Sequence, residues 1–370
     1  MDTLFPFHLP SPAIWYVTLY VVTLFMHVAF MSYVLAGAVM LGVAGLRGML
    51  GRTPQVSARA SAWSPVTTVL KDWMHFALSA AITAGIAPLL FVQILYQQEF
   101  YTANLLGFAR WMSILPVLIV AFYLMYLLKA HRIEGKTVAQ ACVALLVMAC
   151  VLFVEWSWVD DHLLSLDRDA WPAMYASGSM TYRSAATLPR MGLWLVAAFP
   201  MAAALIAWQL RAGASGVDAR AGDAATRALA MLGAVMTAAA AIAAWPVLNA
   251  PHVPDHAATE RAATIWLVVA SVGAGGALVA WLALARAQTS SARLLAVASV
   301  GTGVFWLGLL VAREAVRWNI VGGEVVAARA AKVGTLAGFV VFLTFAVAGV
   351  VTVGWIVRRV AMDLRRAERR

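Results

Sequence analysis

Two ionisable residues, His27 and Glu314, lie within or at the edge of long apolar runs and are the first candidates for chemistry. His27 stands in FMHVAFMSY and Glu314 in WLGLLVAREAVRWN. A charged side chain in membrane hydrocarbon costs about 2.5–3.5 kcal/mol on insertion scales. Each such residue therefore needs a partner, a water-filled cavity or a cofactor.

His27 has two interpretations. A neutral imidazole can ligate haem iron through one ring nitrogen while the other nitrogen finds a hydrogen-bond acceptor. Alternatively, His27 makes an interhelical hydrogen bond, which is the commoner role of a lone histidine between membrane helices.

Glu314 and Arg317 are three residues apart and share one helix face, so the arginine can neutralise the carboxylate or hold a haem propionate. The alternative is an ion pair at the level of the lipid headgroups. Upstream, Arg190 and Met191 open a further apolar run, in LPRMGLW. Arg190 is expected to extend toward the headgroups and Met191 to pack, although a thioether can also ligate haem iron.

The remaining histidines are expected to be ordinary polar residues. His75 begins an apolar run beside Lys71 and Asp72, and His162 follows two aspartates in a predicted loop. The His/Asp groups at His162 and in APHVPDH, with His252 and His256, could bind a divalent metal, but their spacing matches no closed zinc pattern and they are expected to be ordinary loop polarity. Cys142 and Cys150 are the only cysteines, and no CxxCH site for c-type haem is present.

The composition identifies the class of protein. Of the 370 residues, 63% are hydrophobic and 12% charged, and the mean hydropathy is +0.83. Soluble domains are nearer half apolar and a quarter charged, so the sequence predicts an all-α, polytopic membrane helix bundle in contact with lipid. The net charge of +10 reflects membrane topology, so we expect no nucleic acid partner.

About nine transmembrane helices are expected, in one integral membrane domain over residues 1–370. The predicted spans lie near 13–45, 73–98, 107–129, 137–158, 188–210, 226–247, 262–285, 292–314 and 333–357. The loop 159–187 is long enough to form a small cap.

Most of the 27 basic residues fall in alternate loops and in the arginine-rich tail. The positive-inside rule then places the N-terminus outside and the C-terminus in the cytoplasm, with the 159–187 cap outside. The expected location is the inner (cytoplasmic) membrane of a bacterium.

The arrangement resembles the large, haem-bearing subunit of cytochrome bd quinol oxidases, which has nine spans with the same orientation. HVAFMSYVLAG from His27 is similar to the family's first span, and FALSAAITAG from Phe76 to its second. Glu314 and Arg317 are similar to the end of its eighth span, although Trp318 is displaced. The resemblance implies that His27 and Glu314 ligate the iron of high-spin haem, of the b or d type.

The chain also departs from that family. Arg190 and Met191 stand where the family has the histidine ligand of its low-spin haem, and the partner methionine is missing from ERAATIWLVV. The quinol-binding loop is reduced to APHVPDHAATERAA, and the paired glutamates of the third span are absent.

These losses predict that electrons come from a c-type cytochrome on another subunit, docked on acidic outer loops, and not from quinol. The function expected is that of a respiratory electron-transfer subunit, either itself an oxidoreductase reducing oxygen or a nitrogen oxide, or a non-catalytic part of one. Two alternatives stay open. One is a haem-free membrane scaffold that anchors redox partners, and the other is a transporter with a broken helix at Gly85 and Pro88.

Overall fold

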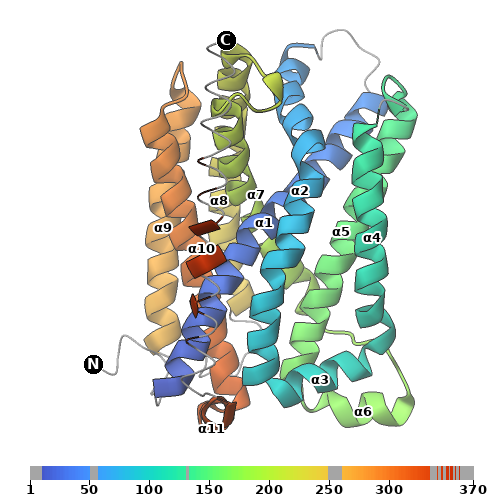
Figure 1. The fold of residues 1–370 in the computed structure, drawn as a ribbon, viewed down its shortest axis with the longest axis vertical. Helices are drawn as coiled ribbons and strands as arrows, with labels where there is room; N and C mark the ends of the chain where they lie inside the picture. Colours follow the sequence, from blue (N-terminus) through green and yellow to red (C-terminus); the bar gives the residue numbers. More distant parts are fainter. Residues whose placement is uncertain are drawn as a thin grey trace.

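The computed structural model describes residues 11–50, 57–130, 133–248 and 261–333, with scattered residues between 340 and 358. Most of these described residues are helical, and none of them is in a strand. Eight long helices run side by side along the longest axis of the molecule (Figure 1). They are α1 (Ser11–Leu50), α2 (Ser57–Leu95), α4 (Phe108–Lys129), α5 (Thr137–Leu166), α7 (Thr187–Arg211), α8 (Ala219–Leu248), α9 (Arg261–Arg286) and α10 (Ala292–Val321).

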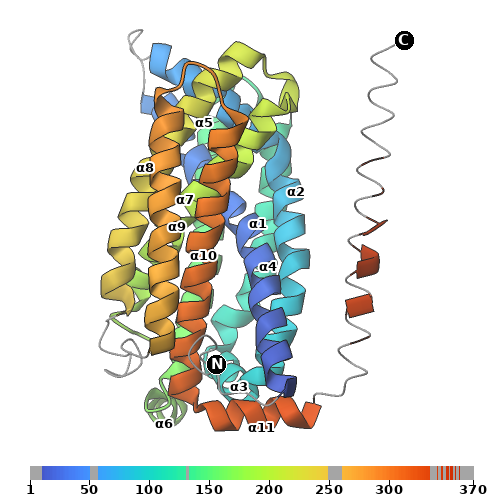
Figure 2. The ribbon, with the colours of Figure 1, turned by 90° about the vertical axis from the view of Figure 1, so that its left-hand side faces the viewer.

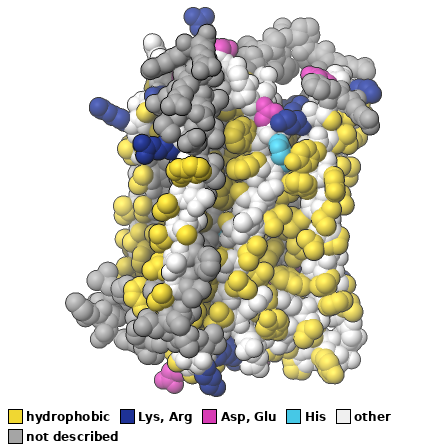
Figure 3. All heavy atoms as spheres, in the orientation of Figure 1, with side chains coloured by type: hydrophobic (Ala, Val, Ile, Leu, Met, Phe, Trp, Pro, Cys, Tyr) yellow, Lys and Arg dark blue, Asp and Glu magenta, His cyan; other side chains and the backbone are white. Residues whose placement is uncertain are grey.

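All eight long helices are apolar enough to cross a membrane. Large hydrophobic side chains cover the middle of the visible face, while charged side chains gather near its two ends (Figure 3). Val279 and Ile242 illustrate this outward apolar face, because 70% and 74% of their side-chain surface is exposed. In water such a face would be unfavourable, so the chain is a multi-pass membrane protein.

The helices agree with the predicted spans in number and order for the first eight. The expected ninth span, 333–357, lies outside the fully described residues. α1, α2, α5 and α10 are longer than predicted, because apolar runs mark the part of a helix in hydrocarbon and not its polar continuation. α2 also stays helical through Gly85 and Pro88, so the break expected of a transporter is not found there.

Glycines set the distance between α9 and α10. A Cβ atom on Gly273 would lie 2.5 Å from the backbone nitrogen of Phe305, and one on Gly308 would lie 2.6 Å from that of Ala270. Both positions therefore require glycine. Small residues permit this close backbone approach, which stabilises helix pairs in membranes through van der Waals contact.

Three short helices close one end of the bundle, which is called the capped end below. They are α3 (Gln97–Leu106), α6 (Ala170–Ser177) and α11 (Gly323–Val333). α11 lies across the bundle at this end (Figure 2). In the predicted topology the capped end faces outward.

The predicted loop 159–187 is in large part helical. α5 continues through Asp160, Asp161 and His162 to Leu166, α6 follows, and α7 begins at Thr187. The expectation that these three residues are ordinary loop polarity is therefore wrong: both aspartates are buried. Partners from other helices compensate their burial, so the helix continues beyond the apolar run.

Candidate functional site

His27 contacts the backbone of the neighbouring helix. Its Nδ1 atom donates a hydrogen bond to the carbonyl oxygen of Ala81 in α2, at 2.9 Å. Because a carbonyl only accepts, the neutral ring carries its proton on Nδ1 and its lone pair on Nε2. Gly85 makes room for the ring, since a Cβ atom there would lie 2.9 Å from Nδ1. The geometry thus realises the interhelical hydrogen bond and leaves Nε2 as the ring's acceptor or ligand atom.

Glu314 is completely buried near the capped end of α10. The Tyr96 hydroxyl donates a hydrogen bond to its Oε1 atom, and Nη2 of Arg313 lies 3.7 Å from Oε2. The same Nη2 atom donates to the hydroxyl oxygen of Tyr20 in α1, at 2.6 Å. Glu314 therefore links α10 to Tyr96, which lies between α2 and α3. The neighbouring Arg313 links α10 to α1.

Arg317 stacks on an aromatic ring instead of forming the predicted ion pair with Glu314. Its guanidinium carbon lies 3.7 Å from the centroid of the Tyr96 ring, a cation–π distance. The ring and hydroxyl of Tyr96 thus serve two different residues of α10. The sequence could not indicate this arrangement, because Tyr96 lies more than 200 positions from both of them.

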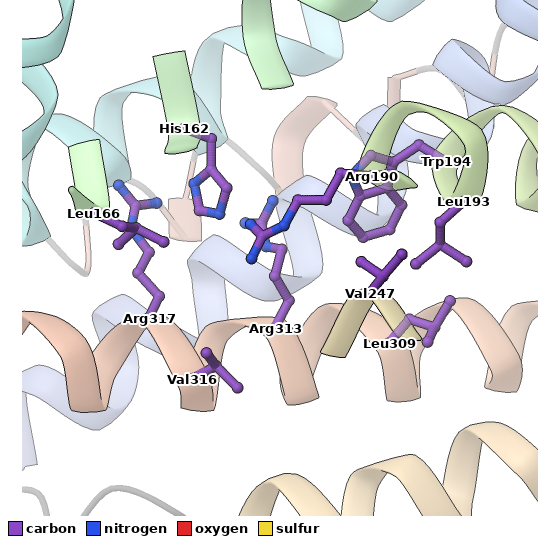
Figure 4. A pocket seen from close by; sticks show the side chains of 10 residues that line it. All are labelled: His162, Leu166, Arg190, Leu193, Trp194, Val247, Leu309, Arg313, Val316 and Arg317. Atoms are coloured by element: carbon purple, nitrogen blue, oxygen red, sulfur yellow. The ribbon is translucent and has the colours of Figure 1, made fainter. Parts of the chain in front are cut away.

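A small cavity lies beside this group (Figure 4). Its polar lining consists of His162 from α5, Arg190 from α7, and Arg313 and Arg317 from α10, whose side chains point toward one another. The cavity has a volume of about 30 Å³. This site is called the arginine cavity below, and its lining contains no carboxylate.

The donors of the arginine cavity are incompletely satisfied. The Nε atoms of Arg190, Arg313 and Arg317 and the Nε2 atom of His162 are buried without a hydrogen-bond partner among the described residues. Native proteins leave few buried polar groups in this state, and each one needs an explanation.

The convergence of these residues was not predicted from the sequence. Arg190 was expected to extend toward the headgroups, and that is wrong: 7% of it is exposed and it faces the cavity. His162 was assigned to a loop. The available signals were the direct continuation of an apolar run into Asp160, Asp161 and His162, and the four-residue spacing of Arg313 and Arg317 on one helix face.

Met191 packs against the cluster of buried residues that includes Met174 and Tyr182. This is the packing role expected for it. Its role as a haem ligand stays a prediction.

The buried aspartates next to the cavity have partners of their own. Asp160 accepts hydrogen bonds from Arg110 at 2.5 Å and from Thr187 at 2.6 Å. Asp161 faces the Asn104 amide, whose nitrogen lies 2.7 Å from its carboxylate when the amide is oriented to donate. Asp160 is therefore paired with a cation outside the cavity, and neither aspartate lines the cavity.

A second buried carboxylate, Glu99 of α3, lies at the capped end. It accepts hydrogen bonds from Arg168 at 2.6 Å and from Arg329 of α11 at 2.7 Å. Burial alone would raise the pKa of Glu99, but the hydrogen bonds from these two arginines lower it below its usual value. These three residues, the Glu99 cluster, attach α11 to the end of the bundle.

The described residues contain no group of three or more His, Cys, Asp or Glu side chains that could hold a metal ion. His75 lies within α2, where its ring contacts Tyr126 of α4 with 4.6 Å between centroids. His131, His252 and His256 lie outside the described residues.

Of the predicted haem ligands, His27 has the donor arrangement that haem ligation requires. His27 offers a free Nε2 atom with its other nitrogen hydrogen-bonded, which is the usual state of a metal-ligating histidine. Oε1 of Glu314 accepts a hydrogen bond from Tyr96, while Oε2 has no hydrogen bond and lies 3.7 Å from Nη2 of Arg313. Pockets for cofactors of haem size hold several hundred Å³, far more than the arginine cavity beside it. Ligation of haem by Glu314 stays a prediction that this geometry does not support.

Fold and site together define an all-α multi-pass membrane protein with a buried, arginine-rich polar group at one end of its bundle. No protein-family model and no curated protein matches the sequence. Functional inference therefore depends on the residues themselves.

Proposed function

We propose that this chain is a haem-binding subunit of a membrane electron-transfer complex, similar in arrangement to the large subunit of cytochrome bd oxidases. The observation that carries the proposal is His27, an intramembrane histidine whose Nδ1–H is held by a backbone carbonyl and whose Nε2 is left to ligate. A bound haem of the b or d type would supply one-electron chemistry.

In this proposal the chain's own residues orient the ligand. The Ala81 carbonyl fixes the tautomer and the ring plane of His27, and Gly85 keeps α2 close enough for that bond. Electrons come from a c-type cytochrome on another subunit, with oxygen or a nitrogen oxide as acceptor.

The proposed docking surface at the capped end is smaller than the sequence predicts. Asp160 and Asp161 are buried, whereas Asp169 and Glu324 are exposed there. A basic cytochrome docked on the capped end would meet these two exposed carboxylates and the half-buried Asp167 among the described residues.

A haem-free scaffold that anchors redox partners is the second candidate. It is favoured by Glu314, because Tyr96 and Arg313 already engage the carboxylate without any cofactor. In that case the His27 bond to Ala81 has a structural role alone.

The visible spectrum of the purified full chain separates the two candidates. With haem ligated by His27, we expect a Soret band that is lost or shifted in His27→Ala and retained in His75→Ala, the matched histidine control. Added imidazole should restore the band in His27→Gly. A folded protein with no Soret band after expression with abundant haem would support the scaffold.

A further inference from the structure

We infer that the arginine cavity is a binding site for a small monovalent anion, such as nitrite or formate. This inference does not rest on haem binding. It starts from the charge of the lining, which combines three guanidinium groups and one imidazole with no carboxylate.

The guanidinium groups are buried and have not been neutralised in full. Arg190 and Arg317 are only 7% and 4% exposed, so solvent does not screen them well. One carboxylate, Glu314, lies 3.7 Å from Arg313 and also accepts a hydrogen bond from Tyr96, so it balances at most one of the three guanidinium charges. Asp160 is paired with Arg110 and Thr187. Buried like charges repel, so an anion between them would lower the free energy of the folded state.

The orientation of the donors favours the same occupant. The side chains of Arg190 and Arg313 approach the cavity from opposite helices, α7 and α10, and His162 faces them from α5 (Figure 4). Each guanidinium retains a buried Nε donor without a partner. Guanidinium groups hydrogen-bond most strongly to charged oxygen acceptors.

The size of the cavity limits the ligand. A water molecule needs at least about 10–15 Å³ of such space, so about 30 Å³ accepts an anion of about two or three heavy atoms. A lipid headgroup, a quinone ring or a porphyrin is far larger. Leu193, Trp194 and Leu309 form the apolar wall that sets this limit.

The test measures anion-dependent thermal unfolding of the purified full chain in detergent. Sodium nitrite and sodium formate are compared with sodium gluconate at equal ionic strength, after long incubation. We expect a saturable rise in Tm with nitrite and formate but not with gluconate. No difference between these salts would overturn the inference.

Two variants locate the effect. Arg190→Gln should weaken anion binding by about tenfold or more, because one charge-assisted donor is lost. Leu193→Phe should abolish binding by filling the cavity while all three arginines remain. Arg183→Gln, which changes an exposed arginine near the same end, is the matched control and should bind as the parent does.

An anion effect on Tm that persists unchanged in both Arg190→Gln and Leu193→Phe would place the anion elsewhere and overturn the inference. A large anion such as citrate that stabilised the parent as strongly as formate would contradict the size limit. The Leu193→Phe variant guards against a folding defect in Arg190→Gln, since it retains every charge of the site.

Discussion

The Glu99 cluster and the arginine cavity both contain arginine beside buried polar groups near the capped end, yet their hydrogen bonds are satisfied to different degrees. Glu99 has one carboxylate between two guanidinium groups, at 2.6 and 2.7 Å, and both of its oxygens are hydrogen-bonded. The arginine cavity has three guanidinium groups, each with a buried Nε donor that has no partner, and an imidazole nitrogen of His162 that has none either. A satisfied cluster holds helices together, whereas an unsatisfied one is suited to bind something.

The largest loss of unfolding free energy is expected when Glu99 loses both of its arginine partners. In the double variant Arg168→Ala/Arg329→Ala, a carboxylate with no exposed surface is left without a cation. Removing the partner of a buried charge costs about 3–5 kcal/mol of unfolding free energy. Chemical unfolding in detergent would measure it.

The single variant Arg168→Ala is the control for that experiment. Arg329 still neutralises Glu99 in it, so its loss of unfolding free energy should be much smaller. Equal effects of the single and double variants would show that Arg329 contributes nothing and that α11 is held otherwise.

An intermediate loss of unfolding free energy is expected from a substitution at Tyr96, which contacts both Glu314 and Arg317. Tyr96→Phe removes the hydroxyl that donates to Glu314 and keeps the ring on which Arg317 stacks. A buried acceptor without its donor costs about 1–3 kcal/mol. Tyr16→Phe, which changes another tyrosine near that end, should leave the midpoint of unfolding unchanged; if both variants behave alike, the Tyr96 bond does not stabilise the fold.

A smaller loss of stability is expected when the pH is lowered, because mild acid protonates Glu99 in only some of the molecules. The pKa of Glu99 is lowered in the folded state by Arg329 and Arg168, despite burial. Its ionised form therefore stabilises the protein fully above the ordinary carboxyl pKa of about 4.3, and this stabilisation is lost as pH falls through the lower folded value.

Tm measured between pH 3 and pH 7 for the parent and for Glu99→Gln checks the sign. The parent should be more stable at neutral pH, and the difference should shrink in acid. A difference that grew in acid would mean that Glu99 does not act through its charge.

The smallest change in unfolding free energy is expected from a substitution at Arg190 in the absence of added anion. Arg190→Gln removes one of three buried like charges, and the Nε atom that is lost had no partner. Unfolding free energy should change by less than about 1 kcal/mol, or rise, in contrast to the Glu99 cluster. A loss as large as that of the double arginine variant would remove the distinction between the two sites.

His27 and His162 show why histidines could be assigned only in part from the sequence. Position in an apolar run placed His27 inside the membrane with two possible roles, and the bond to Ala81 is one of them. His162 looked like a loop residue because it follows two aspartates. The burial of those aspartates depends on Arg110, Thr187 and Asn104, which come from other parts of the chain.

Arg190 and Arg317 were recognised as residues of interest, but their surroundings were not predictable. Near a helix end, an arginine is ordinarily expected to reach toward water along its flexible stem. Whether it can do so depends on what covers that end, and α5 and α10, which place His162 and Arg313 beside Arg190, have no visible relation to it in the sequence.

The sequence by itself determined that this is an all-α membrane protein and where its first eight long helices lie, because hydrocarbon demands long apolar runs with internally satisfied backbones. Only the tertiary structure decided which polar residues meet. A buried charge is tolerated where distant partners converge on it, and that convergence arises from the packing of α1, α5, α7 and α10 and the helices of the capped end. The same packing left the arginine cavity without a carboxylate, and that shortage of negative charge is the physical reason to expect an anion there.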